Sequence, residues 1–261
     1  MKSSPIRWVG GKSRLRKQIL ERIPDHDCYV EVFGGAAWVL FAKEPSKAEV
    51  YNDVDGELVN LFLILQRRPE EFLEAFRRML YAREVFESLR ATDPIWLDEL
   101  TRAVRYFYLV RVSFGGKMEA YGTTTGRSLT LNLKKLPGIV EEAHRRLQKV
   151  QIDRLTYELC LDRYDREHCF FYLDPPYWED EKFRYALGPG RHRELRKRLG
   201  GLEGRWLLSY NDHEEVRRLY EGYRIEEVKV RYHLGSKGGQ AKRVSELLIS
   251  NYDPKTGERM A

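Results

Sequence analysis

The chain has little of what marks secreted, membrane-bound or metal-binding proteins. Its three cysteines, Cys28, Cys160 and Cys169, are too few and too scattered for a disulfide framework, and they lack the spacing of metal ligands. No cluster of His, Cys and carboxylate residues indicates a metal, and we expect none. No apolar run is long enough to span a membrane. The N-terminus lacks the apolar region of a signal peptide, so we expect a cytoplasmic protein.

The charge balance is basic. Lysine and arginine total 46 against 40 acidic residues, which gives a net charge of +6. The basic residues gather in five segments, some of which also contain aromatic residues or glycine: residues 7–17, 102–127, 145–149, 191–198 and 231–243. Basic clusters interleaved with Tyr, Phe and Gly are typical of proteins that bind a polyanion. Nucleic acid is therefore the leading candidate partner.

The first third of the chain predicts alternating strands and helices. An apolar segment at residues 28–32 ends in Phe33-Gly34-Gly35, and residues 36–43 read as a helix. A strand, a glycine turn and a helix form the opening of a Rossmann-like unit. A second short strand at residues 48–51 ends in Asn52-Asp53.

The rest of the chain predicts an insertion followed by renewed alternation. Apolar residues recur at helical spacing from Gly56 to about Arg90, and residues 97–112 predict another helix. Residues 114–136 show no regular spacing of apolar residues that would face a core. Further elements are then expected at residues 138–149, 153–155, 170–173, 192–199, 206–210, 226–232 and 246–251. We therefore expect an α/β fold with a core of residues 1–56 and 137–261 and an inserted, mainly helical lobe of residues 57–136.

The most informative stretch is Asp174-Pro175-Pro176-Tyr177. It follows the apolar run at residues 169–173, which predicts a buried parallel strand. The two prolines fix the backbone and donate no hydrogen bond, so the loop is stiff. Open α/β sheets bind ligands at the carboxyl ends of their strands. A carboxylate, bare carbonyl oxygens and an aromatic face suit a planar ring that bears an amino group.

The glycine turn and Asp53 indicate a ligand that contains adenosine. The turn lacks the full spacing of a nicotinamide site, but it allows a ligand to approach the backbone above a helix N-terminus. An acidic residue roughly 20 residues beyond such a turn can accept hydrogen bonds from ribose hydroxyls. Asp53 stands there. An equally good local interpretation is that Asn52 and Asp53 cap the helix that begins near Gly56.

Gly10-Gly11-Lys12 is not a phosphate-binding loop of the P-loop type. That pattern requires a glycine five residues before Gly11, where Ile6 stands, and no strand precedes it. A tryptophan, a glycine pair and a lysine before a helix suit the binding of a small carboxylate. A flexible N-terminal hinge is the alternative interpretation.

These segments occur in the order seen in one enzyme family. The motifs are Arg7-Trp8-Val9-Gly10-Gly11-Lys12, Val30-Glu31-Val32-Phe33-Gly34-Gly35, Asn52-Asp53 and Asp174-Pro175-Pro176-Tyr177. Residues 105–114, 208–212 and 242–249 extend the match. Over nearly its whole length, the chain resembles DNA adenine-N6 methyltransferases of the Dam-like, D12 class.

The resemblance implies a Rossmann-like, S-adenosylmethionine-dependent methyltransferase core with an inserted, mainly helical DNA-recognition lobe. The implied cofactor-binding residues are Trp8, Lys12, Phe33, Gly35, Asp53 and Asp174. The chain departs from the family where Ala37 replaces a usual Gly, where Trp38 replaces a small residue, and where Val32 replaces a frequent Pro. Residues 115–132 do not clearly follow the family's recognition loop, so the recognised DNA sequence does not carry over.

The implied reaction transfers a methyl group from S-adenosylmethionine to the exocyclic N6 of adenine in double-stranded DNA, after the base leaves the duplex. Asp174 and the Pro175 carbonyl would accept the two N–H groups of the adenine, and Tyr177 would stack on the base. Residues Arg111, Lys117 and Arg127 are expected to contact DNA, at phosphates more than at base edges. No obligate protein partner is indicated.

Two other functions remain open. Methylation of cytosine N4 acts on the same kind of amino group and is the closest alternative. A DNA-binding relative that has lost catalysis is the second, and the intact Asp53, Asp174 and Tyr177 argue against it. The sequence does not distinguish a phage enzyme from a restriction-modification enzyme or a solitary regulator.

Overall fold

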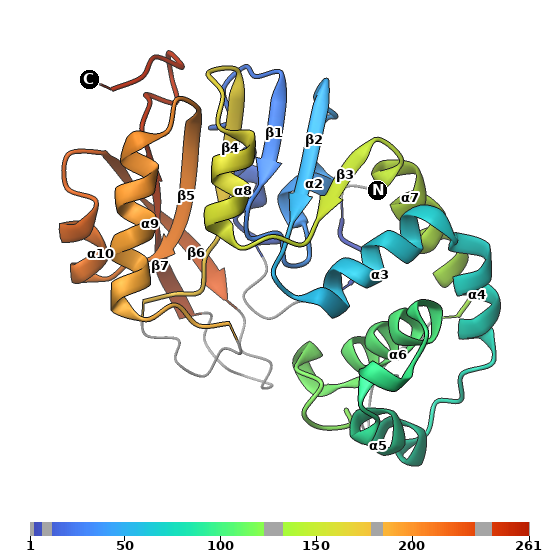
Figure 1. Cartoon of the computed structure of the whole chain (residues 1–261). Coiled ribbons are helices and arrows are strands. Elements are labelled where there is room, and N and C mark those ends of the chain that lie inside the picture. The colour runs from blue at the N-terminus through green and yellow to red at the C-terminus, as the bar shows by residue number, and fades with distance from the viewer. Residues whose placement is uncertain (1–2, 7–11, 123–132, 179–184, 233–241, 261) are drawn as a thin grey trace. The chain divides into compact units, whose positions relative to one another are not determined.

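The computed structural model describes residues 3–6, 12–122, 133–178, 185–232 and 242–260. The chain divides into two compact units. The first contains residues 1–12, 35–43 and 53–154, and the second contains residues 13–34, 44–52 and 155–261. Figure 1 shows the helices and strands of both units. The predicted helical lobe, residues 57–136, falls wholly within the first unit, which also includes segments on either side of it.

In the described part of the second unit, six strands form a sheet. They are β1 (Cys28–Glu31), β2 (Ala48–Asn52), β4 (Cys169–Leu173), β5 (Arg205–Asn211), β6 (Arg224–Tyr232) and β7 (Lys242–Ser250). Strands β2, β1, β4 and β5 pair in parallel, and β7 pairs antiparallel with both β5 and β6. With β3 (Val150–Asp153), the order among the described residues is β3-β2-β1-β4-β5-β7-β6. The order 3-2-1-4-5 is that of a doubly wound sheet, so the predicted α/β, Rossmann-like fold is confirmed.

Strands β1 and β4 are buried along their whole length, as their apolar sequences predict. Among the described residues, the helices of this unit are α1 (Arg16–Leu20), α8 (Tyr157–Tyr164), α9 (Pro189–Gly201) and α10 (Glu214–Leu219). Apolar side chains of β4, β5 and α9, including Phe171, Leu208 and Leu195, share one core cluster. Helices α8 and α10 were not predicted, because each contributes few buried residues to its short length.

The first unit is mainly helical. Its elements are α2 (Trp38–Ala42), α3 (Gly56–Arg67), α4 (Pro69–Arg77), α5 (Arg83–Ala91), the 3-10 turn η1 (Pro94–Trp96), α6 (Glu99–Val112), the 3-10 turn η2 (Phe114–Gly116), α7 (Leu136–Leu147) and β3. Pro69 ends the long predicted helix and begins α4. Phe107 of α6 packs edge-on against Phe72 and Phe76 of α4, with ring centroids 5.3 and 5.2 Å apart. The unit therefore has an aromatic core of its own.

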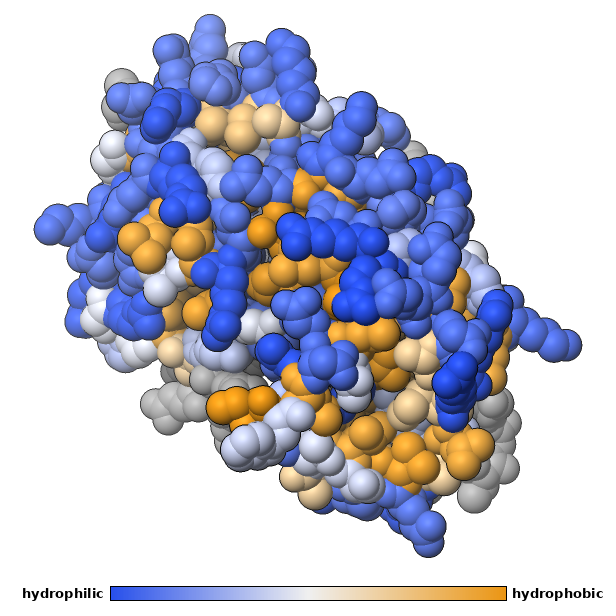
Figure 2. All heavy atoms as spheres, turned by 45° about the vertical axis from the view of Figure 1, so that its right-hand side comes forward, coloured by the Kyte–Doolittle hydropathy of each residue, from blue (hydrophilic) through white to orange (hydrophobic). Residues whose placement is uncertain are grey.

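The surface is largely hydrophilic, with apolar side chains between the charged ones on the face shown in Figure 2. The most exposed large apolar side chains are those of Ile95 and Trp96 in η1, at 75% and 84% exposure. Within the part of the chain that the structure describes, no helix has the length and apolar character needed to cross a membrane. No group of three or more potential metal ligands is found among the same residues.

Candidate active site

The loop that contains Asp174 leaves the carboxyl end of β4, as predicted. All five residues of β4 are buried, Asp174 is half-buried and Pro175 is buried. The strand lies between β1 and β5 in the parallel part of the sheet. The loop is therefore held by a strand with neighbours on both sides, which gives its side chains a rigid base.

The carboxylate of Asp174 is held by a side chain from β5. Ser209 Oγ donates a hydrogen bond of 2.9 Å to Asp174 Oδ1 and lies 3.3 Å from the Leu173 carbonyl oxygen. The Tyr172 hydroxyl lies 2.9 Å from the same Ser209 Oγ. Sequence reasoning missed both contacts, because no local pattern links Ser209 to a residue 35 positions earlier.

Tyr177 is anchored at its hydroxyl. That group donates a hydrogen bond of 2.9 Å to Oε2 of Glu246, a buried residue of β7. The Tyr177 ring also lies against the ring of Tyr210 on β5, with centroids 5.9 Å apart and planes at 31°. Both contacts restrict the rotation of the aromatic face that we expect to stack on a base.

Trp178 belongs to an aromatic cluster beside this loop. Its ring stacks on His192 of α9 at 4.9 Å and on His213 at 6.3 Å. His192 is buried and shares a hydrogen bond with the Tyr210 hydroxyl. Burial lowers the pKa of His192 to about 4 and raises the pKa of Tyr210, so both rings are uncharged at neutral pH. His192 and Tyr210 therefore add no charge to this cluster.

The glycine turn after β1 packs against β2. The backbone N–H of Gly34 donates to the Asn52 carbonyl at 2.8 Å, and a Cβ at Gly34 would lie 2.2 Å from the Tyr51 ring. The side chain of Asn52 donates to the Val32 carbonyl and accepts from the Leu155 N–H. Asn52 therefore links the segments that follow β1 and β2 to the segment before α8.

Phe33, a predicted cofactor contact, is partly buried at the start of this turn. Its ring stacks on Tyr157 of α8 with centroids 5.5 Å apart and planes at 30°. Within the second unit, the ring is thus held by an unpredicted helix. The stacked pair gives Phe33 a defined orientation.

Asp53 and Gly35 are brought together in the first unit. Oδ2 of Asp53 accepts from the Gly35 N–H at 2.7 Å, and Oδ1 accepts from the Asp55 N–H at 2.8 Å. Burial raises the pKa of Asp53 to about 6, although these backbone hydrogen bonds act in the opposite direction. Asp55 is the N-cap of α3, since its side chain accepts from the Glu57 N–H. The interpretation of Asn52 and Asp53 as the cap of that helix is therefore wrong.

Two other features of the first unit concern predicted cofactor contacts. Gly35 has a φ of +48° and Ala37, before α2, has a φ of +54°. The left-handed conformation at Ala37 explains why glycine suits that position better. Lys12 is buried, whereas Trp8 lies outside the described residues.

The three predicted DNA contacts have different surroundings. Arg111, in the last turn of α6, donates to the carbonyl oxygen of Pro5, and its guanidinium lies 4.9 Å from the centroid of the Phe107 ring. Lys117 follows η2 and is exposed. Arg127 lies outside the described residues, as does the predicted glycine-rich linker at residues 235–239.

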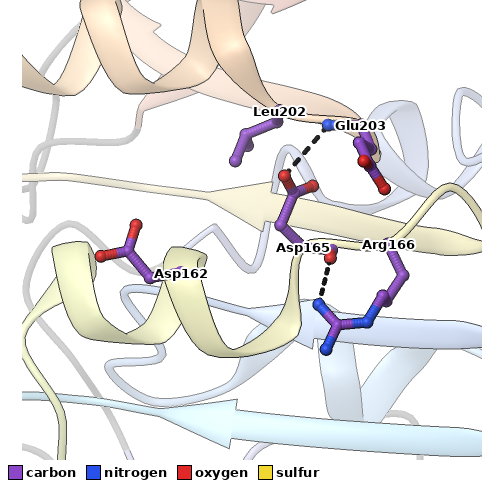
Figure 3. A pocket seen from close by; sticks show the side chains of 5 residues that line it. All are labelled: Asp162, Asp165, Arg166, Leu202 and Glu203. Carbon is purple, nitrogen blue, oxygen red and sulfur yellow. Dashed lines mark hydrogen bonds between the residues drawn. The ribbon is translucent and has the colours of Figure 1, made fainter.

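A cavity of about 500 Å³ lies at the opposite edge of the sheet, where β4 and β5 begin (Figure 3). It is lined by Asp162, Asp165, Arg166, Leu202 and Glu203. The Asp165 carboxylate accepts from the backbone N–H groups of Glu203 and Gly204, at 3.1 and 3.0 Å. Asp162 forms an ion pair with Arg198 at 2.7 Å. These carboxylates have partners that stabilise the fold, and the cavity does not include the loop after β4.

The sequence is similar to those of known DNA methyltransferases. A DNA adenine methylase of Salmonella typhi is 28% identical over 262 residues, which cover 93% of each chain. The type II methyltransferase M.CviBI of Paramecium bursaria Chlorella virus NC1A is 26% identical, over 95% of this chain and 98% of the relative. The solved structure of precorrin-6y C5,15-methyltransferase from Geobacter metallireducens GS-15 has a TM-score of 0.40 and 12% identity, over 90% of this chain and 86% of that one.

A match to a family model identifies the family. The model of the D12 class N6 adenine-specific DNA methyltransferases matches residues 8–234. It spans the glycine turn, Asp53, the helical stretch and the loop after β4. The chain therefore belongs to the D12 class N6 adenine-specific DNA methyltransferase family.

Proposed function

We propose that this chain transfers a methyl group from S-adenosylmethionine to the N6 amino group of adenine in double-stranded DNA, with Asp174, Pro175 and Tyr177 as its catalytic residues. The observation that carries the proposal is the fixed geometry of the loop after β4. The Asp174 carboxylate is bonded to Ser209, and the Tyr177 ring is anchored through Glu246. Acceptor and stacking face are thus preorganised, as a reaction that depends on positioning requires.

The chemistry follows from the weak nucleophilicity of the adenine amino group, whose lone pair is delocalised into the ring. S-adenosylmethionine, when bound, supplies a methyl group on a positively charged sulfur, which keeps the electron pair of the broken C–S bond. The Asp174 carboxylate and the Pro175 carbonyl accept the two N–H groups, which directs the nitrogen lone pair toward the methyl carbon. One amino proton then passes to the Asp174 carboxylate or to water as the N–C bond forms.

The first unit has features that fit the adenosine part of this cofactor. Backbone N–H groups orient both oxygens of Asp53, and each oxygen keeps a second lone pair that can accept from a ribose hydroxyl. A pKa of about 6 leaves Asp53 mostly ionised at neutral pH. We assign Asp53 to the ribose, and Trp8, Lys12, Phe33 and Gly35 to the rest of the cofactor. Asp174 is expected to contribute to cofactor binding as well.

We further propose that the target adenine leaves the duplex and stacks on Tyr177, because within the duplex its amino group is paired to thymine and its faces are covered by neighbouring bases. Lys117, which is exposed, supplies a cation for a phosphate, and Arg127 supplies another. Arg111 joins them only if it exchanges its contact with Pro5. A cytoplasmic location, where DNA is available, is part of the same proposal.

The test is transfer of radiolabelled methyl groups from S-adenosylmethionine to unmethylated genomic DNA, followed by hydrolysis and identification of the nucleoside. Labelled N6-methyl-2′-deoxyadenosine is the expected product. Labelled N4-methyl-2′-deoxycytidine would show that the enzyme acts on the cytosine amino group instead. DNA binding without any labelled nucleoside would identify a relative that has lost catalysis. An Asp174→Ala variant serves as the blank.

A further inference from the structure

Two hydroxyl groups and one carboxylate form a hydrogen-bond chain within the second unit. It runs from the hydroxyl of Tyr172 on β4, through Ser209 Oγ on β5, to Oδ1 of Asp174, with both steps at 2.9 Å. Leu173 lies between the two ends in sequence and is the register partner of Leu208. This hydrogen-bond chain therefore bridges two neighbouring parallel strands where both approach their carboxyl ends.

The direction of the hydrogen bonds follows from the groups involved. An ionised carboxylate and a backbone carbonyl can only accept, so the single proton of Ser209 points toward Asp174 or the Leu173 carbonyl oxygen. Ser209 must then accept from the Tyr172 hydroxyl. Burial raises the pKa of Tyr172 well above its ordinary value, and the charge of Asp174 raises it further. Tyr172 therefore keeps its proton at neutral pH and can donate to Ser209.

The hydrogen-bond chain has little freedom to rearrange. Tyr172 is 1% exposed and Ser209 is not exposed at all, so water cannot replace either hydrogen bond. A buried hydroxyl left without a partner is costly, which favours this one arrangement over other rotamers. One oxygen of Asp174 is thus held on the side of Ser209, and the plane of the carboxylate is fixed with it.

We propose that Ser209 and Tyr172 are positioning residues that orient the Asp174 carboxylate so that Oδ2 accepts the N–H of the target amino group. The proposal rests on the proposed function and deepens it. Neither hydroxyl touches the substrate. They act through Asp174, whose acceptor atom must lie within hydrogen-bond distance of the reacting nitrogen while the methyl group is in line behind it.

The alternative is that the two hydroxyl groups only join β4 to β5. The two roles differ in what their loss changes. A purely structural contact affects stability, whereas a positioning contact lowers the rate of the chemical step and leaves ground-state affinities unchanged. The protein offers matched controls. Tyr29 is an equally buried tyrosine that donates to Glu31 at 2.8 Å, and Ser250 is a buried serine that donates to the Tyr252 carbonyl at 2.7 Å.

The kinetic experiment compares Ser209→Ala and Tyr172→Phe with the controls Ser250→Ala and Tyr29→Phe. Single-turnover methylation of genomic DNA is measured together with the melting temperature and the KM for both substrates. We expect Ser209→Ala to slow methylation by about 10- to 100-fold, because a misplacement near 1 Å costs that much. Tyr172→Phe, which leaves Ser209 in place, should slow it by about 3- to 10-fold. KM values and the control rates should stay within about twofold.

Ser209→Thr retains the hydroxyl and should restore most of the rate lost in Ser209→Ala. Rates of Ser209→Ala and Tyr172→Phe equal to those of their controls would overturn the proposal. The proposal would fail equally if the rates fell only in proportion to a loss of folded protein, as judged by the melting temperature.

A second readout does not depend on activity. Proton NMR of the wild type should show slowly exchanging hydroxyl protons for Tyr172 and Ser209, and Ser209→Ala should expose the Tyr172 hydroxyl to faster exchange. Rapid exchange of both protons in the wild type would show that these hydrogen bonds do not persist in solution, and the proposal would be wrong. A wild type that shows these protons but methylates no adenine would instead contradict the proposed function.

Discussion

The hydroxyl of Tyr177 donates a hydrogen bond of 2.9 Å to Oε2 of Glu246, a residue 69 positions further along the chain. The contact joins the loop after β4 to the last strand, β7. It fixes the hydroxyl end of a ring that also lies against Tyr210. Tyr177 therefore has two separable parts: a ring that can stack on a base and a hydroxyl that sets the orientation of that ring.

Tyr177→Phe keeps the stacking face and removes the anchor. We expect methylation to slow by about tenfold, since a hydrogen bond to a charged group contributes about 1.5–3 kcal/mol, part of which packing against Tyr210 retains. Tyr177→Ala should lose considerably more, because base stacking contributes about 1–3 kcal/mol in addition. The kcat of each variant on genomic DNA is the measurement. Equal rates for the two variants would show that the ring does not stack on the substrate.

Asp174→Ala should abolish turnover, with a loss of at least about 100-fold, because it removes an acceptor that acts in the transition state. DNA affinity and melting temperature should change little, since Asp174 is only half-buried. Methyl transfer and DNA binding are measured on the same preparation. Turnover within a few-fold of the wild type would exclude Asp174 as the acceptor.

The pKa of about 6 at Asp53 predicts a pH effect on cofactor binding. Above pH 6 the carboxylate is ionised and accepts from the ribose, so affinity for S-adenosylmethionine should fall as the pH drops through 6. Calorimetry from pH 5 to 8 measures this. Asp53→Ala should bind weakly at every pH, without that inflection. An unchanged affinity in the variant would confine Asp53 to its contacts with Gly35 and Asp55.

The raised pKa of Asp53 also predicts an effect on stability. The native carboxyl group keeps its proton up to about pH 6, while the unfolded one releases it near pH 4. The contribution of Asp53 to the unfolding free energy is therefore fully present below pH 4, falls as the pH rises to 6 and is constant above it. Urea unfolding of wild type and Asp53→Ala at pH 4.5 and 7 gives the difference. If the wild type exceeded Asp53→Ala in unfolding free energy by more at pH 7 than at pH 4.5, the result would contradict a raised pKa at Asp53.

Gly34→Ala should destabilise the second unit by about 1–3 kcal/mol, because the new Cβ would lie 2.2 Å from the Tyr51 ring. Gly138→Ala in α7 is the control, since its Cβ would meet nothing within 4 Å and a helical alanine should add up to about 1 kcal/mol. Urea unfolding gives both values. If Gly34→Ala were as stable as the wild type, the turn would be looser than the structure shows.

DNA affinity should fall steeply with salt, because lysine and arginine displace counterions from phosphates. If Lys117 and Arg127 each contact a phosphate, replacing either with Ala should reduce the log–log salt slope by about 1. Binding should then weaken evenly across DNA sequences. A variant whose loss of affinity depends on the sequence would instead identify a base contact. Fluorescence anisotropy from 50 to 300 mM salt distinguishes these outcomes.

The sequence predicted β1, β4 and β5 well because buried parallel strands are continuous apolar runs. The apolar residues 169–173 therefore predicted correctly that the loop with Asp174 follows a strand. The sequence placed β3 at residues 153–155, whereas the strand is Val150–Asp153. Prediction failed at α8 and α10, which are short, polar and bury few side chains. A capping residue, Thr156, was the available signal for α8.

The partners of the site residues lay beyond the reach of sequence reasoning for a different reason. Ser209 and Glu246 meet Asp174 and Tyr177 only because β5 and β7 are neighbours of β4 and β5 in the folded sheet. Asn52 illustrates the same limit. Local pattern made it a helix cap, whereas its side chain spans to Val32 and Leu155, the latter 103 positions away.

The place of β7 between β5 and β6 has a consequence for synthesis of the protein. A chain that emerges from the ribosome without residues 242–250 has β5 as an open edge strand, and β6 has no described strand partner. Such an edge is prone to pair with other chains. It also lacks Glu246, so the Tyr177 hydroxyl does not have this hydrogen-bond acceptor until β7 has been synthesised and paired. The pairing of β7 thus covers this edge and completes the contacts of the loop after β4, so its folding is the step at which aggregation competes with formation of the site.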